Sequence, residues 1–133
     1  MRRRRIKHTK KEEAMAINLN KKAVQQAERL IPAGEIAAHN NNWQEEKPTP
    51  EELNAYLKAH SMEEYGSWFL GINPQVPAHV KEHYDYPYGD FKDVQRAALL
   101  FSIEKAQKAG HAEIAGVAKK LLELVDKQLK GNK

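Results

Sequence analysis

The apolar periodicity of the last third of the sequence is the feature that most restricts the fold. Apolar residues recur at three- and four-residue spacing on both sides of Gly110, which is typical of two amphipathic helices sharing a core. Asp90 is predicted to cap the first helix, and the second is predicted to run from about Ala112 to Leu129. The apolar positions are Val94, Ala97, Ala98, Leu100, Phe101, Ile103, Ile114, Val117, Ala118, Leu121, Leu122, Val125 and Leu129. The chain is therefore expected to end in an antiparallel helix hairpin.

Two further helices are predicted upstream of this hairpin. Asn20 is expected to cap a helix from about Lys21 to Ile31, since its side chain can accept a hydrogen bond from a helix-start amide. Thr49 and Glu52 have the spacing of a capping box, in which each side chain bonds the backbone of the other. This pair predicts a helix from Thr49 to about His60.

The middle of the sequence predicts little β structure. The aromatic and branched run 67–72 is too short for a helix and predicts one buried extended segment. Residues 74–89 contain three prolines and a glycine, which exclude a continuous helix and predict a long aromatic loop. Residues 33–47 form a turn-rich connector in which Trp43 is predicted to fold back over the core. We therefore expect a mainly α fold, a small helical domain with a minimal β segment over residues 16–133.

Composition narrows the class of protein. Hydrophobic residues make up 41% and charged residues 30% of the 133 residues, which is ordinary for a globular chain. The longest apolar run, 97–101, is far shorter than the roughly 20 residues of a membrane span. The absence of cysteine excludes disulfides and thiolate metal sites. These features predict a cytoplasmic protein with no cofactor and no membrane association.

Charge is concentrated at the start of the chain. Residues 1–11 hold seven cations and no acid, whereas the remainder holds 15 basic against 18 acidic residues. The candidates for phosphate contacts with nucleic acid are Arg2, Arg3, Arg4 and Arg5. The alternative for residues 1–15 is a solvated, disordered basic tail, as charge runs commonly form. A third alternative is that translation starts at Met15, which would remove the tail from the working protein.

One metal-binding motif is present. Residues 79–83 match the H-x-x-E-H pattern of inverted zinc metallopeptidases. On a helix, His79 and His83 would lie one turn apart and face one zinc ion, with Glu82 as the base toward bound water. Neighbouring prolines leave about one and a half helical turns, so the alternative is incidental metal binding by the two histidines. A small metal-dependent hydrolase is accordingly the third hypothesis for function.

Tyrosines and acids cluster over residues 84–90. Such rings can form a binding surface for a peptide, or they can pack over the core as a lid. The candidates for the binding surface are Trp68, Tyr84, Tyr86, Tyr88, Asp90 and Arg96. None of the serines lies in a G-x-S-x-G elbow, so acyl transfer has no support in the sequence. The leading hypothesis is a non-enzymatic interaction module for another protein, and the runner-up is a nucleic-acid-associated protein that uses the basic tail.

Residues 65–124 resemble a family of small bacterial and phage-associated proteins of unknown function. The shared residues are Trp68, Leu70 and Gly71 (W-x-L-G), residues 86–90 (Y-P-Y-G-D), Val94, Arg96 and the alanine-rich helix pair ending at Leu122. In that family similar domains can be joined to phage head-maturation protease regions, which implies a protein partner and assigns no reaction. The resemblance also directs attention to Arg96, whose guanidinium is expected to bridge Asp90 or another loop carboxylate.

Overall fold

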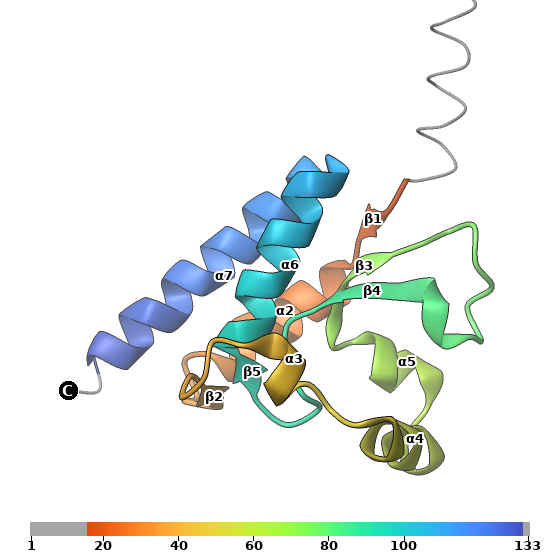
Figure 1. Cartoon of the computed structure of the whole chain (residues 1–133), viewed down its shortest axis with the longest axis horizontal. Coiled ribbons are helices and arrows are strands. Elements are labelled where there is room, and N and C mark those ends of the chain that lie inside the picture. The colour runs from red at the N-terminus through yellow and green to blue at the C-terminus, as the bar shows by residue number, and fades with distance from the viewer. Residues whose placement is uncertain (1–15, 132–133) are drawn as a thin grey trace, which may run out of the picture.

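A computed structural model describes residues 16–131 of the chain. Figure 1 shows a pair of long helices on one side and a small antiparallel sheet with two short helices on the other. The helices are α2 (Lys21–Leu30), α3 (Trp43–Glu46), α4 (Pro50–Ala59), α5 (Met62–Gly66), the 3₁₀ helix η1 (Lys81–His83), α6 (Arg96–Ala109) and α7 (Ala112–Gly131). The strands are β1 (Asn18–Leu19), β2 (Ile36–Ala37), β3 (Phe69–Ile72), β4 (Tyr84–Pro87) and β5 (Val94–Gln95).

The strands form two sheets, so the expectation of a mainly α fold with a minimal β segment is wrong. The first sheet is antiparallel in the order β1-β3-β4, and the second pairs β2 with β5 in parallel. β4 lies inside residues 74–89, which were expected to be a loop, and Val94 lies in β5 instead of the first hairpin helix. These strands of two to four residues depend on partners far along the chain, so local patterning does not reveal them. The described residues form a mixed α/β fold.

The C-terminal helix hairpin is confirmed. Gly110 ends α6 in the left-handed conformation, with φ of 79°, and its amide bonds back to the last turn of the helix. The buried residues of α7 are Ile114, Ala115, Ala118, Leu121 and Val125. Because they recur at three- and four-residue spacing, α7 presents one apolar stripe to the core.

The start of α6 differs from the prediction. The helix begins at Arg96, with Gln95 at its cap, and Asp90 does not cap it. Asp90 Oδ1 instead accepts from the backbone N–H of Lys92 and Asp93 at 3.1 and 2.8 Å, and its Oδ2 accepts from Gln95 Nε2 at 2.9 Å. Asp90 therefore shapes the turn that leads into β5.

The helix predicted from Lys21 is confirmed as α2, but its capping residue acts differently. Asn20 is buried at the cap position and makes no capping bond with its side chain. Its Nδ2 donates to the carbonyl oxygens of Gly66 and Phe69, each at 3.0 Å. Because buried polar groups need partners, these bonds tie the start of α2 to α5 and β3.

The capping box of Thr49 and Glu52 is confirmed at the start of α4. Thr49 Oγ1 accepts from the N–H of Glu52 at 3.1 Å, and Glu52 Oε1 accepts from the N–H of Thr49 at 2.8 Å. A second capping box, formed by Ser61 and Glu64, starts α5. No residue of α4 is buried, so its local signals carry more of its stability than in other helices.

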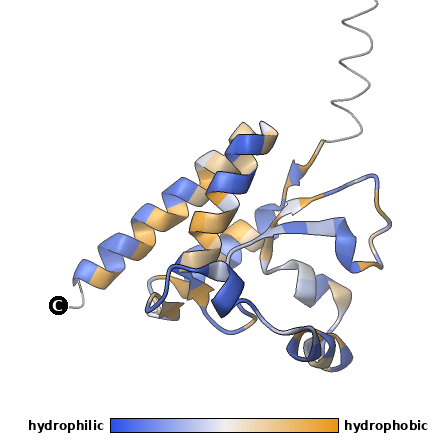
Figure 2. Cartoon of the chain, viewed as in Figure 1, coloured by the Kyte–Doolittle hydropathy of each residue, from blue (hydrophilic) through white to orange (hydrophobic). Residues whose placement is uncertain are grey.

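The main core lies where the antiparallel sheet meets α2, α6 and α7. Figure 2 shows apolar residues along α6 and in a stripe on α7, whereas most of the residues of α3 are hydrophilic. Tyr86 and Phe91 have φ values of 66° and 72°, a region that bulky residues rarely adopt. Within residues 16–131, no helix combines the length and the apolarity that crossing a bilayer requires.

Candidate interaction surface

Three of the aromatic candidates are core residues. Trp68, Tyr86 and Tyr88 are 7%, 1% and 0% exposed, and the rings of Trp68 and Tyr88 stack at 5.4 Å. Tyr88 donates its hydroxyl to the carbonyl of Ser67 at 2.8 Å and accepts from Gln26 Nε2 at 2.9 Å. Burial, the larger cause, and the nearby Asp85 carboxylate raise the pKa of Tyr86 to about 12. These rings pack as the lid alternative describes, and they offer no surface to a partner.

The remaining candidates of that group are partly exposed and do not converge. Tyr84 packs its ring against Phe69, with ring centroids 6.4 Å apart. The expected bridge from Arg96 to Asp90 is not formed, because Arg96 reaches the other hairpin helix. Its Nε and Nη2 donate to Asp126 Oδ1 and Oδ2 at 2.8 and 3.2 Å. Arg96 therefore fastens α6 to α7, and Asp90 belongs to the turn before β5.

The histidine pair does not assemble a zinc site. His79 lies before η1, which covers only residues 81–83, so the helical spacing required by the motif is absent. His83 Nδ1 lies 2.7 Å from the carbonyl oxygen of Val76. No group of three or more potential metal ligands is placed to hold an ion within residues 16–131. Arg2, Arg3, Arg4 and Arg5 lie outside the described residues.

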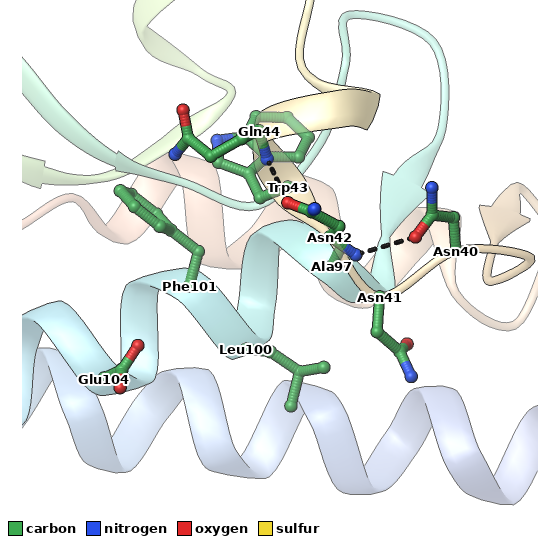
Figure 3. A pocket seen from close by; sticks show the side chains of 9 residues that line it. All are labelled: Asn40, Asn41, Asn42, Trp43, Gln44, Ala97, Leu100, Phe101 and Glu104. Carbon is green, nitrogen blue, oxygen red and sulfur yellow. Dashed lines mark hydrogen bonds between the residues drawn. The ribbon is translucent and has the colours of Figure 1, made fainter.

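A groove lies between residues 40–44 and α6. We call it the amide groove; its volume is about 690 Å³, and the residues that α6 contributes are Ala97, Leu100, Phe101 and Glu104. Figure 3 shows Phe101 extending from α6 toward Trp43 and Gln44, with the three asparagines along the other side. Trp43 is 7% exposed and packs with Ala97 and Phe101, which confirms that it folds back onto the molecule.

Asn41, Asn42 and Gln44 each accept a hydrogen bond through the side-chain oxygen. Asn41 Oδ1 accepts from Arg96 Nη1 at 3.2 Å, and Asn42 Oδ1 accepts from the N–H of Gln44 at 3.0 Å. Gln44 Oε1 accepts from Lys47 Nζ at 2.8 Å. Because each oxygen faces a donor, the orientation of all three amides is fixed. The NH₂ groups of Asn41, Asn42 and Gln44 make no hydrogen bond within residues 16–131, whereas Asn40 Nδ2 donates to Glu45 Oε1 at 2.8 Å. Three amides on the rim of the groove therefore have donors available to a ligand.

A second concavity, the stacked pocket, lies between α4 and the turn at residues 90–92. Its volume is about 480 Å³. Tyr56 is sandwiched there, with its ring centroid 3.8 Å from that of His60 and 4.4 Å from that of Phe91. The planes of these rings are nearly parallel, at 12° and 13°. The pocket also includes Glu46 of α3, so α3 stands between the two concavities.

The sequence analysis did not identify the amide groove as a candidate interaction surface. The run of three asparagines beside Trp43 was visible in the sequence, but it was interpreted only as a turn-rich connector. Leu100 and Phe101 were assigned to the core because they fit the helical stripe of α6, yet both are partly exposed. Their juxtaposition with residues 40–44 depends on tertiary contacts between segments more than 50 residues apart.

The comparisons with known proteins add no identity. No protein-family model, no curated protein and no solved structure matches this chain. The resemblance of residues 65–124 to small phage-associated proteins therefore stays a prediction.

Proposed function

We propose that this chain is a non-enzymatic protein interaction module that binds an extended segment of a partner protein in the amide groove. The proposal rests on one observation: partly exposed Leu100 and Phe101 line the same groove as a rim of amide donors. Extended peptides expose carbonyl oxygens along both edges, and those oxygens accept hydrogen bonds from amide N–H groups. The groove thus offers both an apolar contact and hydrogen-bond partners for the same ligand.

The chemistry of the lining supports binding in preference to catalysis. Glu104 is the one ionisable residue that lines the groove, and the remaining polar side chains there are carboxamides. Carboxamides neither take up nor release protons near neutral pH, so a general acid and base pair is missing from the lining. Burying an apolar side chain is worth about 1.5–3 kcal/mol, so Leu100 and Phe101 are expected to supply much of the affinity.

The test uses a random peptide library displayed on phage and selected against the immobilised full-length chain. Selected peptides are then measured by fluorescence anisotropy against Leu100→Ala and Gln44→Ala. The first variant removes apolar contact and the second removes one amide donor without changing the core. We expect Leu100→Ala to weaken binding about tenfold, equivalent to 1.4 kcal/mol.

Two matched variants make this test specific. Leu124→Ala removes a leucine that is 40% exposed on α7, outside the groove. Gln107→Ala removes an exposed amide of α6 that does not line the groove. Peptides that lose no affinity in Leu100→Ala and Gln44→Ala, or lose as much in the two control variants, would overturn the proposal.

A nucleic-acid-associated protein is the second candidate, and the seven cations of residues 1–11 favour it. Replacing Arg2, Arg3, Arg4 and Arg5 with glutamine in the full chain is expected to weaken binding to a mixed-sequence DNA duplex. Because each phosphate contact adds roughly 0.9 to the salt slope of log K, the slope should fall by about three to four. An unchanged slope excludes this candidate.

The setting of the interaction is part of the proposal. The absence of cysteine fits the cytoplasm, where thiol chemistry is reducing and disulfides are rare. The resemblance to bacterial and phage-associated proteins favours a protein as the partner. Both points support an interaction module without naming what it binds.

A further inference from the structure

Within residues 16–131, the amide groups left free on the rim of the amide groove are donors. Asn41 Oδ1 accepts from the guanidinium of Arg96 at 3.2 Å, and Gln44 Oε1 accepts from the ammonium of Lys47 at 2.8 Å. Arginine and lysine can only donate, so each of them holds the amide oxygen and leaves the NH₂ group for a ligand. The N–H of Gln44 holds Asn42 Oδ1 in the same way. A ligand that lies along this rim therefore meets N–H groups and must present oxygens.

The side chains of the groove offer few acceptors in return. Asn40 Oδ1 accepts from the N–H of Asn42 at 2.9 Å, and the backbone oxygens of Asn42 and Trp43 accept from residues 45–47. Glu104 supplies the remaining side-chain acceptor, a carboxylate that is 70% exposed. A peptide in the β conformation exposes N–H groups as well as carbonyls, and a buried N–H without a partner is costly. The groove thus disfavours a ligand whose own N–H groups need partners.

Proline is the residue that meets this condition. It has no backbone N–H, yet its carbonyl oxygen accepts hydrogen bonds like any other. Proline-rich segments adopt the polyproline II helix, whose backbone is fully solvated because the helix has no internal hydrogen bonds. Such segments dock in aromatic-lined grooves, and the lining of the amide groove includes Trp43 and partly exposed Phe101. The donors and the rings therefore favour the same ligand.

The length of the groove fits one turn of a polyproline II helix. Its lining on α6 runs from Ala97 to Glu104, a stretch of α-helix that rises about 10 Å. One turn of polyproline II contains three residues and rises about 9 Å, so prolines three positions apart face the groove together. Glu104 lies at one end of this lining, beyond Phe101 in Figure 3. A basic residue beside the prolines complements the charge of its carboxylate.

We propose that the partner segment bound in the amide groove is a proline-rich sequence in the polyproline II conformation, with a basic residue next to Glu104. This inference rests on the proposed function, because it names the class of ligand for the same groove. The amides of the rim donate to the carbonyl oxygens of the segment, and its proline rings lie against Leu100 and Phe101.

Labelled peptides of defined sequence test the class of ligand by fluorescence anisotropy with the full-length chain. The probe is decaproline, and the control is a Gly-Ser peptide of the same length, which lacks both the rings and the preformed helix. We expect decaproline to bind roughly tenfold more tightly than the control, and Leu100→Ala to weaken its binding about tenfold. Equal binding of the two peptides overturns this inference.

Isosteric substitutions test the amide donors. Asn41→Asp and Gln44→Glu replace an NH₂ group by an oxygen and keep the acceptors for Arg96 and Lys47. Each should weaken the binding of decaproline about fivefold, which corresponds to the loss of one hydrogen bond. Gln107→Glu adds the same charge to α6 outside the groove and should change nothing. An unchanged affinity in both groove variants would contradict the role of the donors.

The acidic end of the groove is tested with an added arginine. Decaproline that carries an arginine at one end or the other should bind about threefold more tightly than decaproline itself, as expected for an exposed ion pair. Glu104→Gln should remove this gain and leave the binding of decaproline unchanged. A gain of the same size in Glu104→Gln rules out the pairing of the basic residue with Glu104.

Peptides selected from the random library separate this inference from the proposed function. Backbone N-methylation removes one N–H of a peptide and keeps its carbonyl, so each methylated peptide should lose less than about threefold in affinity. Peptides that depend on Leu100 but lose more than about tenfold on N-methylation use their own N–H groups. In that case the proposed function stands and this inference is wrong. If no peptide depends on Leu100, both are wrong.

Discussion

α7 and α4 are both amphipathic helices of the described chain, yet different interactions hold them in place. α7 buries five residues, including Leu121 and Val125, whereas α4 buries none. α4 begins with a complete capping box and contacts the main core through Tyr56, which stacks on Phe91. The comparison teaches that burial fixes the helix hairpin, while local hydrogen bonds and one aromatic contact fix α4.

The largest expected effect on stability comes from truncating a core residue of the helix hairpin. Leu99 on α6 is fully buried, so Leu99→Ala leaves a cavity and should lower the free energy of unfolding by about 2–5 kcal/mol. Urea denaturation followed by circular dichroism measures the change. Leu124→Ala, at a position 40% exposed, should stay within about 0.5 kcal/mol of the native chain. Similar losses in both variants would contradict the assignment of α7 and α6 to a packed core.

Two glycines sharpen the contrast between packed and open positions. A Cβ at Gly89 would lie 2.5 Å from the carbonyl oxygen of Asp93 and 2.7 Å from the ring of Trp68. Gly89→Ala should therefore cost about 1–3 kcal/mol, as overpacking does. Gly116 in α7 has nothing within 4 Å of a Cβ, so Gly116→Ala should stabilise by about 0.5–1 kcal/mol. Thermal unfolding of both variants checks the opposite signs; a stabilised Gly89→Ala would refute the close packing.

Removing the capping box tests how far local hydrogen bonds stabilise α4. Thr49→Ala removes one hydrogen bond from the start of α4 and is expected to cost about 1 kcal/mol. Because α4 has no buried residue, hydrogen exchange should speed up about fivefold in α4 and stay unchanged in α6 and α7. Thr49→Ser keeps the accepting hydroxyl and is the control. Faster exchange throughout the molecule would show that α4 and the core unfold together.

The smallest effect concerns the ion pair that joins α6 to α7. The hydrogen bonds from Arg96 hold the pKa of Asp126 below its usual value, so the pair contributes stability above the unfolded pKa of about 3.9. That contribution is lost as the pH falls through the lower pKa of the folded state. Asp126 is 42% exposed and solvent screens it, so the contribution is about 1 kcal/mol or less.

Measuring the free energy of unfolding against pH tests this assignment. Asp126→Asn should remove the part of the acid destabilisation that this carboxyl causes between about pH 4 and pH 2. Asp93→Asn is the comparison, because the side chain of Asp93 makes no ion pair within residues 16–131. If both variants keep the acid profile of the native chain, the Arg96–Asp126 pair does not link protonation to stability.

Several elements were predictable because their signals are local. The capping box of α4 and the left-handed Gly110 that ends α6 both depend on residues within one or two turns of each other. Backbone amides at a helix start need nearby acceptors, and a left-handed glycine ends a helix wherever it stands. Because residues close together in the sequence satisfy these requirements, the amino-acid pattern alone is sufficient to predict such helix ends.

The strands and both concavities were decided by tertiary structure. β4 is defined by the ladder that it shares with β3, and Tyr86 is turned inward by that ladder and by a φ of 66°. Tyrosine occurs both at protein surfaces and in cores, so the sequence of residues 84–90 did not show whether these rings form a binding surface or pack into the core. The amide groove needs Asn41 beside Arg96, a contact across 55 residues.

The sequence by itself thus determined that two long helices flank Gly110 and how charge divides between residues 1–11 and the rest. Only the tertiary structure decided which apolar side chains stay at the surface. The physical reason is that the neighbours that bury a side chain come from distant segments, so the helical stripe predicted from the sequence included Leu100 and omitted Leu99. Leu100 and Leu99 are adjacent on α6, and packing buries Leu99 completely while leaving Leu100 beside the groove.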